Sequence, residues 1–131
     1  MSFEPFSIAV DRKRRRIDFT FRGFWTLRTF AEYEAASFAA FRTLHWQGSD
    51  HTVLADLSEF AIQSQDVFAA MTRMLEDDPH PPRRFALVGG TGLAQMQFRR
   101  AIRGDGMRLF AARAEAEVWL DEDRRDARRV A

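Results

Sequence analysis

Cysteine is absent from this chain of 131 residues. Its absence excludes a disulfide framework, a thiolate metal site and a cysteine nucleophile, and it agrees with a reducing compartment. The sequence also lacks the roughly 18–20 consecutive apolar residues of a membrane span, and its first residues lack the apolar segment of a signal peptide. We therefore expect a cytoplasmic protein without a membrane span.

An excess of charge of either sign is also missing. The chain has 20 lysines and arginines against 19 aspartates and glutamates, which gives a net charge of +1. This balance does not favour nucleic acid as a partner, and none of the three tryptophans sits among regularly spaced basic residues. Charges cluster in a basic run at residues 12–16 and again in residues 121–131. We expect a solvated turn at the first place and a frayed, charged C-terminal tail at the second.

Tyrosine is scarce, with one residue against 13 phenylalanines, and this excess of phenylalanine over tyrosine favours a dry, well-filled interior. Hydrophobic residues make up 46% of the chain, which is enough for one core at this length but not for two. The prediction is a single domain over residues 1–131, with the charged tail beginning at about residue 121.

Two segments near the start, residues 6–10 and 17–21, alternate between apolar and polar side chains. This period of two predicts an antiparallel hairpin with the basic run at its tip. Apolar runs at residues 53–55, 85–88 and 107–110 predict three further strands. Helical spacing predicts helices over about 27–45, for three turns after residue 64, over about 91–103, and after residue 110. Phe38 and Leu93 are among the side chains expected to face the core.

The predicted order is therefore strand, strand, helix, strand, helix, strand, helix, strand, helix. Strands that alternate with helices pair in parallel through right-handed crossovers. The fold class expected is α/β, with one mixed sheet, one antiparallel edge and helices packed against the sheet.

The most informative stretch is residues 52–67, where an apolar strand ends in Asp56-Leu57-Ser58 and a short loop leads to Ser64 at the start of a helix. Unpaired N–H groups and the helix dipole favour a negative group at such a place. The Ser64 hydroxyl is equally suited to accept the N–H of Asp66 or Val67 as an N-cap, which contributes about 1 kcal/mol.

With this motif, the predicted order of elements resembles the STAS family, the domains shared by anti-sigma-factor antagonists (SpoIIAA-like proteins) and the tails of sulphate transporters. The resemblance rests on residues 53–64, with support from the strand-glycine-helix join at residues 88–90 and from the last helix, which carries Trp119 and Leu120. It implies a SpoIIAA-like fold and a regulatory binding module. In antagonists of that family, a partner kinase phosphorylates a serine in an Asp-Ser-Ser-Gly motif that opens the matching helix.

This chain departs from that motif, because the matching segment reads Gln63-Ser64-Gln65-Asp66. Ser64 falls on the phosphorylated serine if the loop is one residue shorter, so Ser64 is a candidate phosphosite. A phosphate there would gain from the helix N-terminus but would lie beside the carboxylate of Asp66, which repels it. The N-cap role is favoured over the switch.

A second candidate place is the turn Gly89-Gly90-Thr91-Gly92, between a strand and a helix, where a small anionic or lipid-like ligand could bind. The turn matches neither the G-x-G-x-x-G nor the Walker pattern. A tight turn with Thr91 as the N-cap is the favoured interpretation.

Catalytic and metal-binding residues are not expected. His45, His51 and His80 share no ligand spacing. Asp56 and Glu59 are close enough in sequence to suggest paired carboxylates, but we expect Asp56 to accept backbone N–H groups instead. We therefore predict no metal, no cofactor and no enzymatic activity.

Our first hypothesis is a non-catalytic regulatory domain that acts by protein–protein interaction, with an anti-sigma-factor-like kinase or another regulator as its partner. A homodimer is also compatible with the sequence. The residues expected at the contact surface are Ser58, Glu59, Gln63, Ser64, Gln65 and Asp66. The alternative is a carrier or sensor of a small apolar or anionic, lipid-like ligand, with the phenylalanine-rich first helix lining its pocket.

Overall fold

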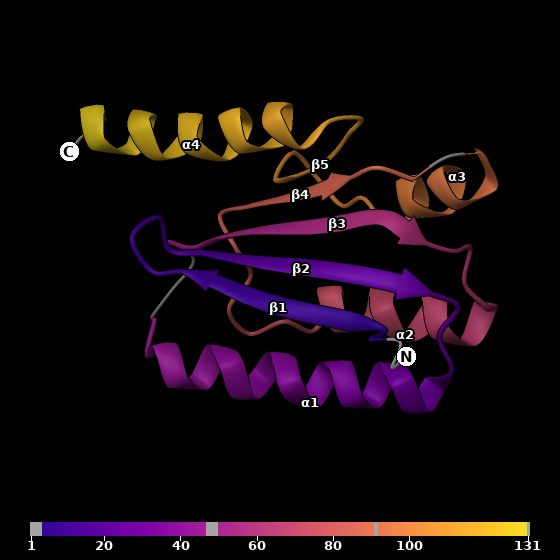
Figure 1. Cartoon of the computed structure of the whole chain (residues 1–131). Coiled ribbons are helices and arrows are strands. Elements are labelled where there is room, and N and C mark those ends of the chain that lie inside the picture. Colours follow the sequence, from indigo (N-terminus) through magenta and orange to yellow (C-terminus); the bar gives the residue numbers. More distant parts are fainter. Residues whose placement is uncertain (1–3, 47–49, 91, 131) are drawn as a thin grey trace.

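A five-stranded sheet forms the centre of the molecule in the computed structural model, which describes residues 4–46, 50–90 and 92–130, with side chains in the last helix as far as Glu122 (Figure 1). The strands are β1 (Phe6–Asp11), β2 (Arg16–Gly23), β3 (Thr52–Phe60), β4 (Arg84–Val88) and β5 (Met107–Phe110). The helices are α1 (Leu27–Leu44), α2 (Gln65–Glu76), α3 (Gly92–Arg100) and α4 (Arg113–Val130). This succession confirms the predicted order of elements and the α/β class.

The strands lie in the sheet in the order of the sequence, β1-β2-β3-β4-β5. β1 pairs antiparallel with β2, and every other pair is parallel, as predicted. Because each parallel connection passes through one helix, the carboxyl ends of β2, β3 and β4 meet the starts of α1, α2 and α3 at one edge of the sheet. We call this edge, on the right in Figure 1, the working edge.

Helices enclose the sheet on both faces. α1 and α2 cover one face, and α4 crosses the other over β3, β4 and β5 (Figure 1). In β3 the side chains of Val53 and Ala55 join the large core under α1 and α2, whereas Leu54 joins a smaller core under α4. The apolar run of β3 is thus a central strand covered on both faces, as predicted. None of the described helices is long and apolar enough to cross a membrane.

The large core is built mainly from aromatic rings. The ring centroids of Phe21 lie 5.0 Å from those of Trp25 and Tyr33, and the Trp25 and Phe60 rings are 5.1 Å apart. A cavity of about 170 Å³ nevertheless remains between the sheet and α1 and α2. The expectation of a well-filled interior is therefore wrong at this place, where aromatic rings and flexible side chains such as Met71 and Met74 line the same cavity.

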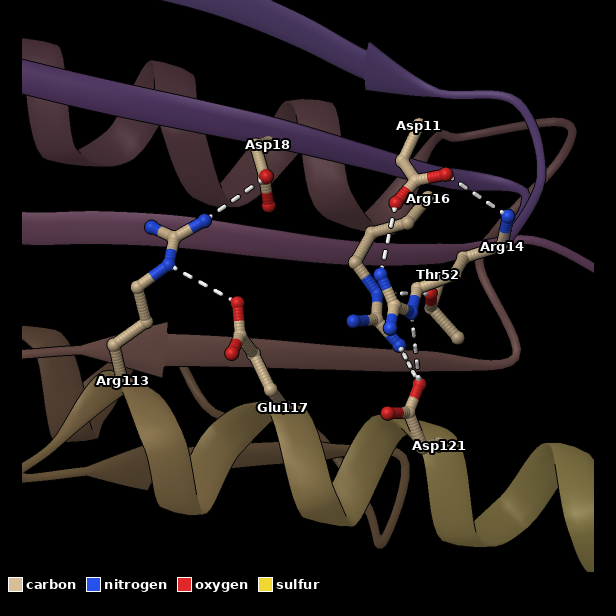
Figure 2. A network of polar contacts seen from close by, with 8 residues as sticks. All are labelled: Asp11, Arg14, Arg16, Asp18, Thr52, Arg113, Glu117 and Asp121. Carbon is tan, nitrogen blue, oxygen red and sulfur yellow. Dashed lines mark hydrogen bonds and ion pairs between the residues drawn. The ribbon is translucent and has the colours of Figure 1, made fainter.

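Arg16 departs from the solvated turn expected at residues 12–16 (Figure 2). It does not belong to a solvated turn: it begins β2 and is only 5% exposed. Its Nε donates to Thr52 Oγ1 at 3.0 Å, and its Nη2 donates to Asp121 Oδ1 at 2.7 Å. The segment predicted as a charged tail is helical over residues 121–130, because α4 continues through Asp121 to Val130. The salt bridge gives the charge of Asp121 a structural partner in the sheet.

A second salt bridge joins α4 to β2 two turns earlier (Figure 2). Arg113 donates to Asp18 Oδ2 at 2.9 Å and to Glu117 Oε1 at 3.2 Å. Burial raises the pKa of Asp18, and the neighbouring Arg113 offsets part of that shift. Charged pairs thus tie α4, which lies over β3, β4 and β5, to β2, a strand that contributes no apolar side chain to the small core under α4.

Two boundaries differ from the prediction. β3 continues to Phe60, so the predicted loop at residues 58–64 shortens to residues 61–64. α3 ends at Arg100 instead of near residue 103. Both differences arise at element ends, where hydrophobic periodicity carries little information.

Phe38 and Leu93 were expected to face the core, and both are exposed. In α1 the adjacent Ser37 lines the cavity, and in α3 the adjacent Ala94 packs against the large core. Neighbouring helical positions lie about 100° apart. In α3 the smaller residue therefore takes the inward position, whereas in α1 both Ser37 and Phe38 line the cavity and Phe38 is also 47% exposed at its opening.

Candidate functional site

Ser64 lies at the working edge and caps α2. Its Oγ accepts the N–H of Val67 at 3.2 Å, and its backbone is extended, with φ −62° and ψ 159°. The predicted N-cap is therefore confirmed. Asp66 lies exposed in the first turn of α2, where the helix dipole favours its negative charge. Phosphorylation of Ser64 stays a prediction.

Gln63 is a buried connector and does not lie on the expected contact surface. Only 5% of the residue is exposed. Its Oε1 accepts the backbone N–H of Trp25 at 2.8 Å, and its Nε2 donates to the carbonyls of Gly23 at 3.0 Å and Ala61 at 2.7 Å. The expectation that Gln63 binds a partner is wrong, because all of its side-chain polar atoms are used inside the protein.

Gln97, a residue that the sequence did not single out, completes this connection. Its Oε1 accepts the backbone N–H of Gln63 at 2.7 Å, and its Nε2 donates to the backbone carbonyl of Gln63 at 2.9 Å. The residues 61–64 are therefore tied to the start of α1 through Trp25 and to α3 through Gln97. We call these five hydrogen bonds the glutamine clip.

Ser58 and Glu59 are exposed, as expected for a contact surface, but they belong to β3 and not to a loop. Asp56 Oδ1 accepts the Ser58 N–H at 3.0 Å and the Ser58 hydroxyl at 2.7 Å, which confirms that Asp56 binds a backbone N–H. Glu59 lies 3.5 Å from Arg22 Nε across the strand pair. These contacts hold the carboxylates of Asp56 and Glu59 in separate interactions.

The glycine turn packs tightly against β3 and α3. A Cβ on Gly89, which has φ +87°, would lie 3.0 Å from backbone atoms of Ser58, and one on Gly90 would lie 3.0 Å from the Phe98 ring. The N–H of Gly89 donates to the Phe110 carbonyl at 2.9 Å. It is thus not available to an anion, and the tight-turn interpretation holds at Gly89 and Gly90. Thr91, the expected N-cap, lies outside the described residues, and Gly92 is exposed at the start of α3.

Large apolar side chains gather at the working edge. Of the eight that are exposed in the described part of the chain, five come from elements that meet there. These five are Phe24, Leu27, Ile62, Leu93 and Met96, with exposed fractions between 45% and 68%. We call them the apolar end patch.

The glutamine clip brings the parts of this patch together. The Gly23 carbonyl accepts the Ala61 N–H at 3.1 Å. Phe24 directly follows Gly23 and Ile62 directly follows Ala61, so this bond brings the two backbones together. Met96 precedes Gln97, which binds the backbone of Gln63. Leu93 lies three residues before Met96, on the same side of α3. The described residues contain no group of three His, Asp or Glu able to hold a metal ion.

Comparison with models of known protein families finds no match to this sequence, and comparison with curated proteins finds none. Comparison of structures does find a match. It is a crystal structure from Shewanella loihica PV-4, described as an uncharacterized protein from the DUF3478 family with a SpoIIAA-like fold. The two chains are 17% identical, the match covers 92% of this chain and 98% of the other, and the TM-score is 0.70.

This chain has a SpoIIAA-like fold. The resemblance drawn from residues 53–64 is thereby confirmed for the fold. At this level of identity the likeness concerns the SpoIIAA-like architecture alone, and the function has to be argued from the working edge.

Proposed function

We propose that this SpoIIAA-like domain is a non-catalytic regulatory module that acts in the cytoplasm by binding a partner protein through the apolar end patch. The partner class that fits is a regulator such as an anti-sigma-factor-like kinase. The single observation that carries the proposal is the gathering of five exposed, large apolar side chains at the working edge. Scattered apolar residues are normal on a protein surface, but a local group of them marks an interaction site.

The glutamine clip supports this role. It joins the short loop at residues 61–64 to α1 and α3 through buried hydrogen bonds. A surface that is already rigid loses less conformational entropy when a partner binds, which leaves more of the contact energy for affinity.

The surroundings of the patch indicate the chemistry of the partner. Two exposed carboxylates flank Ile62 in the sequence: Glu59 lies near the end of β3, and Asp66 lies in the first turn of α2. A partner that presents apolar side chains flanked by a lysine or arginine would bury the patch and pair with these carboxylates. Ser58, Ser64 and Gln65 would lie at the margin of such a contact.

The test places a photo-crosslinking amino acid at Leu93 in the full chain, expressed in its own host. The matched control places it at Val118, which is 57% exposed. Val118 belongs to α4, the helix on the face of the sheet opposite α1 and α2. We expect one protein to be crosslinked from position 93 and not from position 118. After that protein is purified, Leu93→Glu should weaken its binding by at least about tenfold, and Val118→Glu should leave it unchanged.

Three results would contradict the proposal. The first is a set of adducts at position 93 no different from those at position 118. The second is a purified partner that binds the Leu93→Glu variant as well as the wild type. The third is an adduct between two copies of this chain, which would make the patch a homodimer interface instead.

A further inference from the structure

The cavity in the large core extends beneath α1 and α2 along the length of the sheet. At the working edge it reaches Gln63 and Gln97, and at the opposite edge it reaches His51, Asp78 and His80. Most of the lining between these ends is aromatic or aliphatic, including Phe19, Phe30, Val53, Met71 and Leu87. The cavity is therefore an apolar chamber with polar groups concentrated at its two ends.

The exposed lining residues show where this chamber meets the surface. Phe38, Pro79 and His80 line the cavity and are exposed, and they come from α1 and from the proline-rich segment after α2. A second hollow between α1 and α2 shares Phe38 and Asp78 with the cavity. A small molecule thus has a route from solvent to the chamber past the end of α2.

One ring nitrogen of His51, at this end of the chamber, has no hydrogen-bond partner among the described residues. This nitrogen is Nδ1, and the residue is 3% exposed. The Phe41 ring lies 5.0 Å from the imidazole and the Trp46 ring lies 6.0 Å from it. A buried polar atom without a partner costs on the order of 1–3 kcal/mol, and a ligand that supplies the partner recovers that cost.

We propose that this cavity binds a small neutral ligand, a single aromatic ring or a short branched chain that carries one hydroxyl group, with the hydroxyl hydrogen-bonded to His51. The volume sets the size of this ligand. A protein cavity of about 150 Å³ lined by apolar residues holds benzene. At about 170 Å³, this chamber accepts one ring with a small substituent. A long-chain lipid would require α1 and α2 to move apart. The site goes beyond the partner-binding role, since its opening at Phe38, Pro79 and His80 involves none of the residues of the apolar end patch.

A hydroxyl group fits His51 better than a carboxylate does. Burial lowers the pKa of His51, so the imidazole is neutral in the folded protein near neutral pH. A neutral imidazole has one donor nitrogen and one acceptor nitrogen, and a hydroxyl group pairs with either. A carboxylate pairs only with the donor, and it would also enter the chamber beside Asp78, whose charge repels it.

The experiment titrates the full chain with p-cresol, toluene and benzoate while backbone amide chemical shifts are recorded. p-Cresol differs from toluene by the hydroxyl group, and benzoate replaces that group with a carboxylate. In the wild type we expect p-cresol to shift amides of cavity-lining residues and to bind about threefold to tenfold tighter than toluene, the contribution of one hydrogen bond. Benzoate should bind more weakly than p-cresol.

Two variants then test His51 itself. His51→Phe keeps an aromatic ring and removes the nitrogen, so p-cresol should fall to the affinity of toluene. His80→Phe is the matched control, because His80 also lines the cavity but is exposed, and p-cresol affinity should stay within about twofold.

The wild-type comparison stands even if His51→Phe fails to fold. The proposal is overturned if p-cresol shifts no lining residue, if toluene or benzoate binds the wild type as tightly as p-cresol, or if a folded His51→Phe binds p-cresol as the wild type does.

Discussion

Replacing Gln63 with leucine tests whether the glutamine clip holds the working edge together. Leucine has a similar volume, so the change removes hydrogen bonds without opening a large cavity. In the variant, the buried N–H of Trp25 and the carbonyl of Ala61 each lose their Gln63 partner. The Gly23 carbonyl keeps the N–H of Ala61 at 3.1 Å. An unsatisfied buried N–H and an unsatisfied part-buried carbonyl together cost on the order of 2–4 kcal/mol.

Urea unfolding followed by tryptophan fluorescence measures this loss directly, since Trp25 lies inside the core next to the clip. A loss of about 3 kcal/mol corresponds to a melting temperature lower by about 10 °C for a chain of this length. The matched control is Gln65→Leu, the same substitution two residues later at an exposed position. That variant should change the free energy of unfolding by less than about 0.5 kcal/mol.

The reasoning is refuted if Gln63→Leu unfolds within about 0.5 kcal/mol of the wild type, or if the two leucine variants lose equal stability. Either result would mean that solvent or a rearranged backbone satisfies the groups that Gln63 now pairs, and that the clip does not set the rigidity of the patch.

Three other sites allow direct tests. Asp121→Asn removes the charge that pairs with the buried Arg16 and should cost about 2 kcal/mol in urea unfolding, whereas Glu122→Gln, at the exposed next position, should cost almost nothing. Burial lowers the pKa of His51 below its ordinary 6.5, so stability is lost as the pH falls from about 6.5 toward the folded pKa. His51→Phe should therefore lose less unfolding free energy than the wild type between about pH 7.5 and about pH 5. Ser64→Ala should cost about 1 kcal/mol, and Ser64→Asp, which keeps a capping oxygen, should cost much less. Mass spectrometry of the protein from its host tests the switch, because a phosphorylated Ser64 fraction that responds to stress supports it and a constant absence contradicts it.

Much of the fold could be predicted from local patterns, because the pattern of each element follows from its own burial. The alternation at residues 6–10 and 17–21 predicts the hairpin, and the continuous apolar run at residues 53–55 predicts a strand covered on both faces. Arg16 was missed since its burial depends on Asp121, which lies 105 residues away in the sequence. No local pattern shows that an arginine at the end of a basic run has such a partner.

The candidate site could be predicted only in part, for the same reason. The position of Ser64 follows from a strand, a loop and a helix start that are adjacent in sequence, and the N-cap was predicted correctly. The role of Gln63 depends on backbone groups of Trp25, 38 residues away, and on Gln97, 34 residues away. A polar residue in a loop reads as exposed unless the partners that bury it are known.

The unfilled space under α1 and α2 has a mechanical consequence. Unfolding lets water occupy internal voids, so a protein with a large void loses volume when it unfolds and is destabilised by pressure. A cavity of about 170 Å³ corresponds to at most about 100 mL/mol, the upper end of the usual range, and only the part that water does not already fill through the opening near His80 contributes. The dry part of the cavity should therefore make this domain easier to unfold by hydrostatic pressure. A molecule that occupies the same space would remove most of that volume change, and so would protect the fold against compression as well as against heat.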